Sequence, residues 1–286
     1  MVIQLENAKK KYGSFELDCS MKLEPGCITG LIGRNGAGKS TAFKLILGLI
    51  RADGGSITID DVNAADLDSE TKRKMGVVLA EAGFSGYLKI KDVAKILKVA
   101  YPAFKEDDFM SQCEKQGLPK DKQIKEFSTG MKAKLKILAA MSHDAEVLIL
   151  DEPTSGLDVI AREEILDMLR DYMKKEENSI LISSHIATDL EGLCDDVYMI
   201  ESGKIILHEE TGVILDEYGV LKVTAEQYEK LDKEYILCAK EESFGFVCLT
   251  AQKNFYIENY PDITIEKAGI DQVITLMISA NGKKEA

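Results

Sequence analysis

The stretch Gly33-Arg34-Asn35-Gly36-Ala37-Gly38-Lys39-Ser40 decides how this chain folds. It matches the pattern G-x-x-x-x-G-K-[ST], in which a glycine-rich loop joins a buried strand to a helix. The flanking residues provide that context, because the apolar run Cys27–Ile32 precedes the loop and a helical pattern continues to Leu47. Glycines leave backbone N–H groups free to converge on phosphate oxygens, and the helix N-terminus adds a favourable dipole. The motif therefore predicts a site for the phosphates of a nucleotide.

The side chains of this loop are expected to divide the contacts. Lys39 is expected to contact the β- and γ-phosphates, and the hydroxyl of Ser40 is expected to bind Mg²⁺. The nucleotide-binding residues predicted from the loop and the first helical turn are Gly33, Arg34, Asn35, Gly36, Ala37, Gly38, Lys39, Ser40 and Thr41.

A second apolar run, Val147–Leu150, ends in two carboxylates, Asp151 and Glu152. Both are expected at the carboxyl edge of the sheet, where ligands bind in α/β folds. We expect Asp151 to hold the metal through its water shell. Glu152 is expected to accept a proton from the water that attacks the γ-phosphate, a role worth about 10²- to 10⁴-fold in rate. The alternative is a solvated strand end.

Period-two and buried-strand patterns together predict an α/β fold. Residues Val2–Leu5 and Phe15–Leu23 alternate apolar with polar side chains, which is typical of half-buried antiparallel strands. Further strand-like runs then alternate with helical stretches, as expected for a parallel core sheet covered by helices. These runs are Ile57–Ile59, Gly76–Leu79, Val147–Leu150, Ile180–Ser183 and Val197–Ile200.

The alternation is interrupted at residues 84–142, where the pattern predicts only helices, at Asp92–Ala100, Glu106–Gln116 and Thr129–Met141. We interpret this segment as an inserted helical subdomain. The expected organisation is a cassette over residues 1–210, with its core at 1–83 and 143–210. A small accessory region follows over residues 211–286, with strands expected at Tyr235–Ala239 and Phe244–Thr250 and a helix at Ala268–Ser279.

Composition limits the classes of partner. With 36 Lys and Arg against 49 Asp and Glu, the net charge is −13, which disfavours a global grip on nucleic acid or anionic lipid. A membrane span needs about 18 consecutive apolar residues, and no apolar run in the sequence approaches that length. The N-terminus lacks the pattern of a secretory signal peptide. We therefore expect a soluble chain in the cytosol. The six cysteines include no C-x-x-C pair and are expected to be reduced thiols.

Two further stretches make the comparison with a family specific. Pro153-Thr154-Ser155-Gly156-Leu157-Asp158 follows the two acids, and Ser183-Ser184-His185 ends the next predicted strand. The chain resembles an ATP-binding cassette (ABC) ATPase, and in particular the nucleotide-binding subunits of bacterial ABC-2-type exporters. The resemblance covers about residues 2–210 and implies a P-loop NTPase fold of the ABC type. It places Asp158 in the D-loop and makes His185 the switch histidine beside the γ-phosphate; His143 and His208 match no motif.

The resemblance also assigns an adenine contact and a contact made in trans. Tyr12 stands where the family has an aromatic that stacks on adenine, with a tyrosine of the core as the alternative. Phe127-Ser128-Thr129-Gly130-Met131 stands at the family signature L-S-G-G-Q, of which Ser128 and Gly130 are retained. In the family this motif closes over the γ-phosphate of the other subunit. An ordinary helix capped by Ser128 is the alternative.

One family position differs in this chain. After the strand Gly76–Leu79, Glu81 stands where the family has the Q-loop glutamine. A carboxylate there could contact Mg²⁺ or its water, but it adds negative charge beside the phosphates. Sensing of the nucleotide and the start of a loop that meets a membrane partner both stay open for Glu81.

The resemblance implies an ATPase that uses ATP and Mg²⁺ to power transport, most simply export, through a separate transmembrane permease. Each motif occurs once, so a homodimer and a heterodimer with a second ATPase are equally compatible with the sequence. The permease is expected to dock near residues 81–95, and the chain to lie at the inner face of the cell membrane without binding nucleic acid. The alternative function is a soluble ABC ATPase in assembly or regulation.

Overall fold

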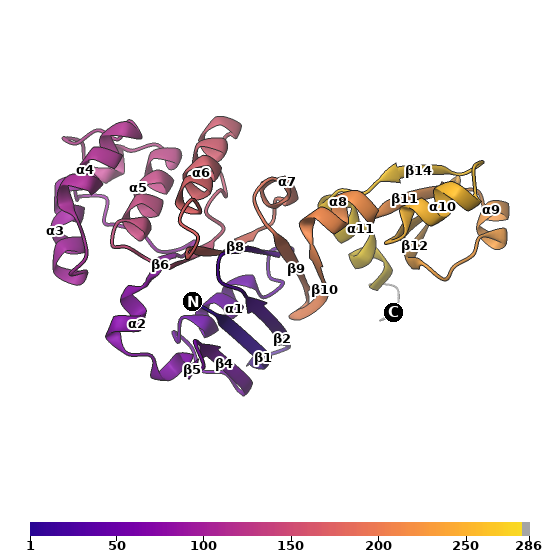
Figure 1. The fold of residues 1–286 in the computed structure, drawn as a ribbon, viewed down its shortest axis with the longest axis horizontal. Coiled ribbons are helices and arrows are strands. Elements are labelled where there is room, and N and C mark those ends of the chain that lie inside the picture. The colour runs from indigo at the N-terminus through magenta and orange to yellow at the C-terminus, as the bar shows by residue number, and fades with distance from the viewer. Residues whose placement is uncertain (282–286) are drawn as a thin grey trace.

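In the computed structural model, which describes residues 1–281, ten strands form one mixed sheet and four more form a separate antiparallel sheet (Figure 1). The large sheet has the order β5-β4-β1-β2-β10-β9-β3-β8-β7-β6. Its strands are β1 (Ile3–Tyr12), β2 (Phe15–Leu23), β3 (Ile28–Ile32), β4 (Gly54–Ile59), β5 (Val62–Asn63), β6 (Met75–Val78), β7 (Val147–Asp151), β8 (Ser179–Ser184), β9 (Asp196–Glu201) and β10 (Lys204–Glu210).

The parallel strands bring the chemistry-bearing loops to one edge of this sheet. β3 pairs in parallel with β8 and β9, and β7 lies in parallel between β6 and β8. Every residue of β3, β7 and β8 is buried, which explains why the sequence shows them as continuous apolar runs. Because parallel strands end on the same side, the residues that follow β3, β7 and β8 are neighbours.

One predicted strand exists, but its predicted place in the sheet was wrong. Ile57–Ile59 was expected within the parallel α/β alternation, but β4 pairs antiparallel with β1, with Ile57 opposite Leu5 and Ile59 opposite Ile3. Four of the six residues of β4 are exposed or half-exposed, and the turn at Asp60 and Asp61 returns the chain directly into β5. A hairpin of this kind belongs to an antiparallel sheet.

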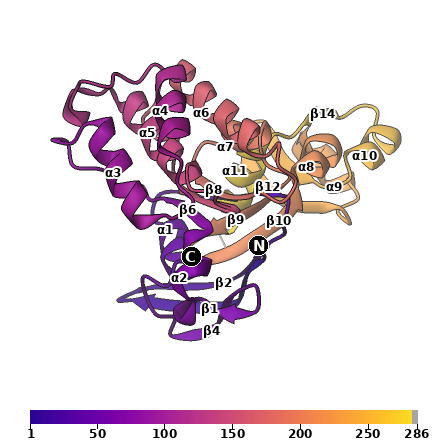
Figure 2. The same ribbon diagram turned by 60° about the vertical axis from the view of Figure 1, so that its left-hand side comes forward.

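The helices expected between residues 84 and 142 are confirmed. In Figures 1 and 2 they lie beyond β6 and β8, away from the end of the sheet that holds β1, β2 and β4. They are α3 (Ile90–Ala100), α4 (Glu106–Lys115) and α5 (Thr129–Met141), with the short 3₁₀ helix η2 (Ile124–Glu126). The remaining helices of the cassette are α1 (Lys39–Ile46), η1 (Ala64–Asp66), α2 (Ser69–Arg73), α6 (Val159–Tyr172) and α7 (Ala187–Glu191).

The second sheet follows residue 210 and has the order β12-β13-β11-β14. The predicted strands and helix of this part are confirmed within a few residues, while β11, β14, α8, α9 and α10 were not predicted. Its elements are α8 (Thr211–Glu217), β11 (Gly219–Val223), α9 (Ala225–Lys230), β12 (Ile236–Glu242), β13 (Gly245–Thr250), α10 (Lys253–Asn259), β14 (Thr264–Lys267) and α11 (Ile270–Asn281). The last five residues of the predicted accessory region lie outside the described residues.

A shared core joins this second sheet to the cassette. Buried Leu190 and Leu193, at α7, belong to the same apolar cluster as Ile270, Val273 and Leu276 of α11. At the start of α11 the backbone N–H of Ile270 donates to Oε1 of Glu191 at 2.6 Å. No helix among residues 1–281 is both long and apolar enough to span a membrane.

Candidate functional site

The loop between β3 and α1 has the geometry of an anion-binding turn. Gly36 and Gly38 have φ angles of 84° and 118°, a region that side chains rarely adopt. At Gly33 a Cβ atom would lie 2.3 Å from the backbone oxygen of Ile200. Glycine is therefore required at Gly33 by space and at Gly36 and Gly38 by conformation. The result is a loop whose backbone ends at the N-terminus of α1.

Lys39, at the start of α1, turns back over this loop. It is 5% exposed, and its Nζ donates to the carbonyl oxygens of Gly33 at 2.6 Å and Arg34 at 3.3 Å. Nζ also lies 3.0 Å from Oε1 of Glu152 in an ion pair without the geometry of a directed hydrogen bond. The ammonium group thus lies at the centre of the loop, where an anion would bind.

Glu152 is held between Lys39 and His185. Its Oε2 lies 2.6 Å from Nδ1 of His185, and its side chain is only 13% exposed. Its backbone has a φ of 52°, which is uncommon for a residue other than glycine. The N–H of Glu152 donates to Oγ of Ser183 at 3.0 Å, which helps to hold this strained turn.

Asp151 precedes Glu152 and is almost fully buried, with 3% exposure. Its Oδ1 accepts a hydrogen bond of 2.7 Å from Oγ of Ser183. Ser183 therefore supports both carboxylates from the neighbouring strand β8. The sequence analysis did not single out Ser183, although its place two residues before His185 was a usable signal, since adjacent parallel strands end together.

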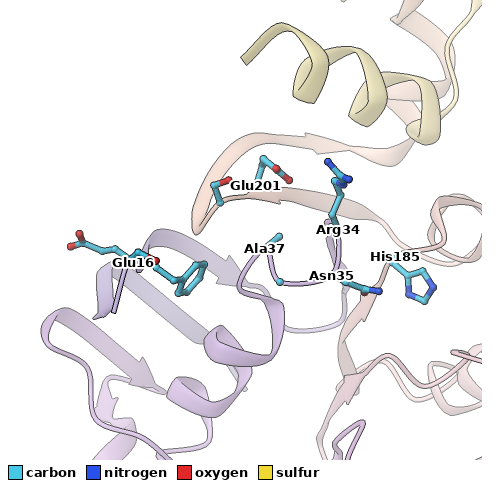
Figure 3. Close-up of a pocket in the computed structure, with 10 residues that line it drawn as sticks. Glu16, Arg34, Asn35, Ala37, His185 and Glu201 are labelled. Carbon is cyan, nitrogen blue, oxygen red and sulfur yellow. The ribbon is translucent and has the colours of Figure 1, made fainter. Parts of the chain in front are cut away.

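A polar cavity of about 760 Å³ lies along the loop. Figure 3 shows Glu16 at one end of the view and Asn35 and His185 at the other, with Ala37 and Glu201 between them. Phe15, Arg34 and Gly36 also line it. A second cavity, of about 460 Å³, joins Asn35, Asp151, Glu152 and His185 to Thr129 at the start of α5. The arrangement suits an elongated, phosphorylated ligand with one end at His185.

Comparisons with known proteins agree with this geometry. The family described as "ABC transporter" matches residues 17–155. The lantibiotic transport ATP-binding protein SrtF of Streptococcus pyogenes is 36% identical over 217 residues, which are 73% of this chain and 91% of that protein. The chain belongs to the ABC transporter family of ATP-binding proteins. It is accordingly an ATP-binding ATPase subunit of a transporter.

Other relatives and solved structures support the same assignment. The bacitracin transport ATP-binding protein BcrA of Bacillus licheniformis is 34% identical over 209 residues, 72% of this chain and 68% of that protein. A solved ATP-binding subunit of an ABC transporter has a TM-score of 0.66 at 25% identity and covers 75% of this chain and 92% of its own. The ABC ATPase cassette bound to ADP and Pi, with a TM-score of 0.64 at 19% identity, shows the shared fold; it covers 73% of this chain and 98% of its own.

The ABC cassette places Tyr12 and Phe15 directly opposite each other in the hairpin of β1 and β2. Phe15 lines the cavity along the loop, whereas the ring of Tyr12 is 48% exposed, lies 5.6 Å from Nζ of Lys10 and is not among the lining residues. Phe15 was missed in the sequence analysis. The two-residue turn at Gly13 and Ser14 was the signal that sets it beside Tyr12.

Two predicted residues cap helices. Oγ of Ser128 accepts a hydrogen bond from the N–H of Met131 at 3.2 Å, so the predicted N-cap of α5 is confirmed. Asp158 caps α6 in the same way, through the N–H of Ala161 at 2.9 Å. Gly130 lies against this α6 turn, since a Cβ atom there would be 3.0 Å from Cβ of Ala161. Neither Ser128 nor Gly130 lines either cavity beside the loop.

Glu81 is not brought to Glu152. It is exposed and lines a separate cavity of about 480 Å³ whose basic side chains are Lys125, Lys132 and Lys136. Lys136 is partly buried there, and this desolvation lowers its pKa. Three lysines thus line the same cavity as Glu81, the residue that stands at the Q-loop position in the resemblance.

The other histidines and the cysteines lie outside the site. His143 is buried against the ring of Tyr101, and burial lowers its pKa to about 4. His208 pairs with Asp196 at 2.7 Å. All six cysteines are free thiols, and burial raises the pKa of Cys194 well above its usual range. The thiols therefore act as small apolar side chains.

Proposed function

We propose that this ATPase powers export through a separate membrane permease, with Glu152 as the base that activates water. The placement of Glu152 between Lys39 and His185, at 3.0 Å and 2.6 Å, carries the proposal. It puts a carboxylate and an imidazole at one end of a cavity whose wall is the phosphate-binding loop. Hydrolysis of ATP needs a proton acceptor and a contact to the γ-phosphate at that end of the cavity.

Binding of ATP rearranges the Lys39–Glu152 pair. The β- and γ-phosphates replace Glu152 and the loop carbonyls as partners of the Lys39 ammonium group. Glu152 is thereby released to accept a proton from the attacking water, while His185 contacts the γ-phosphate. Because Glu152 is held on a strained turn by Ser183, little reorganisation is needed when the water arrives.

The residues present fit a magnesium ion bound together with the nucleotide. Within residues 1–281, no group of three or more His, Cys, Asp or Glu side chains is placed to hold a metal ion. Ser40 and Asp151 offer the hard oxygen donors that Mg²⁺ prefers, and Ser183 orients Asp151. When bound, Mg²⁺ supplies charge neutralisation between the β- and γ-phosphates.

The nucleoside end belongs at the hairpin of β1 and β2. Phe15 stands in the cavity wall next to the loop, and Tyr12 lies opposite it on the same face of the hairpin. Stacking on aromatic rings tolerates differences between bases. We assign the adenine contact to this aromatic pair.

Two cassettes close over the nucleotides in the proposed cycle. Ser128 and Gly130, which line neither cavity beside the loop of their own chain, serve the γ-phosphate held by the other cassette through the N-terminus of α5. Val159 and Ile160, 76% and 75% exposed directly after Asp158, provide an apolar contact for that second cassette. ATP binding thus drives dimerisation, and hydrolysis releases the dimer.

The permease docks on the helical segment in this proposal. An apolar groove between α3, α5 and β6 is lined by Phe84, Ile96 and Tyr101, and Tyr87 and Val99 beside it are 75% and 89% exposed. Relatives named for lantibiotic and bacitracin transport favour the export direction. The chain then works at the inner face of the cell membrane, with residues 1–210 as the cassette, 84–142 as its helical subdomain and 211–286 as the accessory region.

The test is detergent extraction of the tagged chain from its native cells, followed by mass spectrometry of the proteins that co-purify. We expect one stoichiometric multi-span partner, which Ile96→Asp and Val99→Asp each remove from the complex. Leu49→Asp is the matched control, because Leu49 is 59% exposed but lies outside the groove. Recovery of soluble partners alone, from a preparation that hydrolyses ATP, would contradict transport and favour an ATPase in assembly or regulation.

A further inference from the structure

Asp189 is a buried carboxylate at the meeting point of three segments of the site. It lies on α7, which begins two residues after His185, and it is 2% exposed. Its Oδ2 accepts a hydrogen bond of 2.6 Å from Oγ1 of Thr154, which is fully buried two residues after Glu152. A charged group in such a position is costly unless partners compensate it, and a core packed with apolar side chains has no need of one.

The second oxygen of Asp189 faces the D-loop helix. Oδ1 lies 3.6 Å from Nε of Arg162, an ionic contact, and Nη2 of the same arginine makes a long hydrogen bond of 3.5 Å to the carbonyl oxygen of Leu157. Arg162 follows Asp158, the cap of α6, by one helical turn. One carboxylate therefore touches the segment after Glu152 and the helix after Asp158.

We propose that Asp189 is a positioning residue for hydrolysis. It links α7 to Thr154 and to Arg162. The segment that follows Glu152 and the segment that follows His185 are therefore both held by the Asp189 side chain. That contact, 2.6 Å from Oε2 of Glu152 to Nδ1 of His185, is the geometry that Asp189 maintains. The inference rests on the proposed roles of Glu152 and His185, and it adds a residue that lines neither cavity beside the loop.

Thr154→Val tests this link without introducing a charge or a cavity. We expect kcat to fall about 10- to 100-fold, because small displacements of reacting groups have effects of that size. The Kd for a non-hydrolysable ATP analogue stays the same, since the phosphate loop is untouched. Thr154→Ser, which keeps the hydroxyl, restores kcat.

Histidine side-chain NMR of the full chain provides a readout that a merely structural role would not move. The chain has only three histidines, so their ring signals are few. Thr154→Val and Asp189→Asn shift the signals of His185 and leave those of His143 and His208 in place. Because this readout needs no turnover, it separates failure of the positioning role from failure of Glu152 as base, which Glu152→Gln reports independently.

Thr29→Val is the matched control. Thr29 is equally buried and donates to Oδ1 of Asp196 at 2.7 Å, but this pair joins β3 to β9 outside the site. We expect Thr29→Val to leave kcat and the His185 signals as in the parent chain. The proposal would be overturned if the His185 signals did not move in Thr154→Val, or if both valine variants lowered kcat in proportion to their loss of thermal stability.

Discussion

Nζ of Lys39 lies 3.0 Å from Oε1 of Glu152, so the cation of the phosphate loop and the carboxylate proposed as the base form an ion pair. The pair is mostly buried, with side-chain exposures of 6% and 13%. Breaking a buried pair by removing one partner leaves an uncompensated charge. The proposed cycle therefore couples the binding of ATP to the release of Glu152 from Lys39.

Glu152→Gln should abolish turnover, with a loss of at least about 10²-fold, because the amide cannot accept the proton of the attacking water. ATP affinity should not fall, since Lys39 loses a competitor for the phosphates. The measurements are ATP hydrolysis, equilibrium binding of ATP, and size exclusion with ATP, in which the variant should accumulate as a dimer. Normal hydrolysis by this variant would remove Glu152 as the base.

Lys39→Ala should act at the binding step. Hydrogen bonds to charged groups contribute about 1.5–3 kcal/mol, which corresponds to a loss of about 10- to 100-fold in ATP affinity. Calorimetric titration of the variant with ATP measures this directly. Unchanged affinity would contradict the assignment of the loop between β3 and α1 to phosphate binding.

Gly33→Ala should reduce ATP affinity, because the new Cβ would lie 2.3 Å from the backbone oxygen of Ile200 and the loop must move. Gly117→Ala is the control: its φ is 70° and open space surrounds the added atom, so only a conformational cost of about 1–2 kcal/mol is expected. Denaturant unfolding should show both variants destabilised. Only Gly33→Ala should bind ATP more weakly. Equal ATP affinities in the two variants would show that the loop at Gly33 does not bind the nucleotide.

Phe15→Ala should weaken ATP binding by about 5-fold or more, the lower end of the usual stacking contribution, and leave pyrophosphate binding unchanged. Tyr12→Ala should have the smaller effect of the two, because its ring lies outside the cavity wall. Competition between ATP and pyrophosphate measures both variants. A larger loss in Tyr12→Ala would assign the base to the more exposed ring.

His143 should make stability depend on pH. Burial lowers its folded-state pKa to about 4 from a value of 6.5, so between these values the unfolded chain binds a proton that the native protein does not. Stability is complete above this window and falls as the pH drops through it, by at most about 1.4 kcal/mol per pH unit. Denaturant unfolding across the window should show a flatter profile for His143→Phe than for the parent chain.

The parallel core was predictable because its strands are buried on both faces. Ile28–Ile32 and Val147–Leu150 therefore appear as uninterrupted apolar runs, and the phosphate motif lies between a strand and a helix in the order that the fold requires. The short strand Thr264–Lys267 was not predicted, since three of its four residues are polar, none is buried, and it is no longer than a turn. Its pairing with β11 is decided by residues more than forty positions earlier.

In the site too, positions set by local spacing were easier to predict than contacts between distant segments. Local spacing predicts where Lys39, Asp151 and Glu152 lie relative to their strands, and parallel pairing then brings His185 to Glu152. The hydrogen bonds of Ser183 to Asp151 and of Thr154 to Asp189 link residues 32 and 35 positions apart. Asp151 and Ser183 are paired across the parallel strands β7 and β8, whereas Thr154 and Asp189 lie beyond the ends of β7 and β8, and their meeting depends on how the chain leaves these strands.

The bond between Glu191 and the N–H of Ile270 joins residues 79 positions apart, and α11 shares its apolar cluster with Leu190 and Leu193. During synthesis on the ribosome, the cassette is complete long before α11 emerges. Until then the nascent chain carries an uncovered apolar face beside α7. A chain that ends before residue 270 keeps that face exposed permanently.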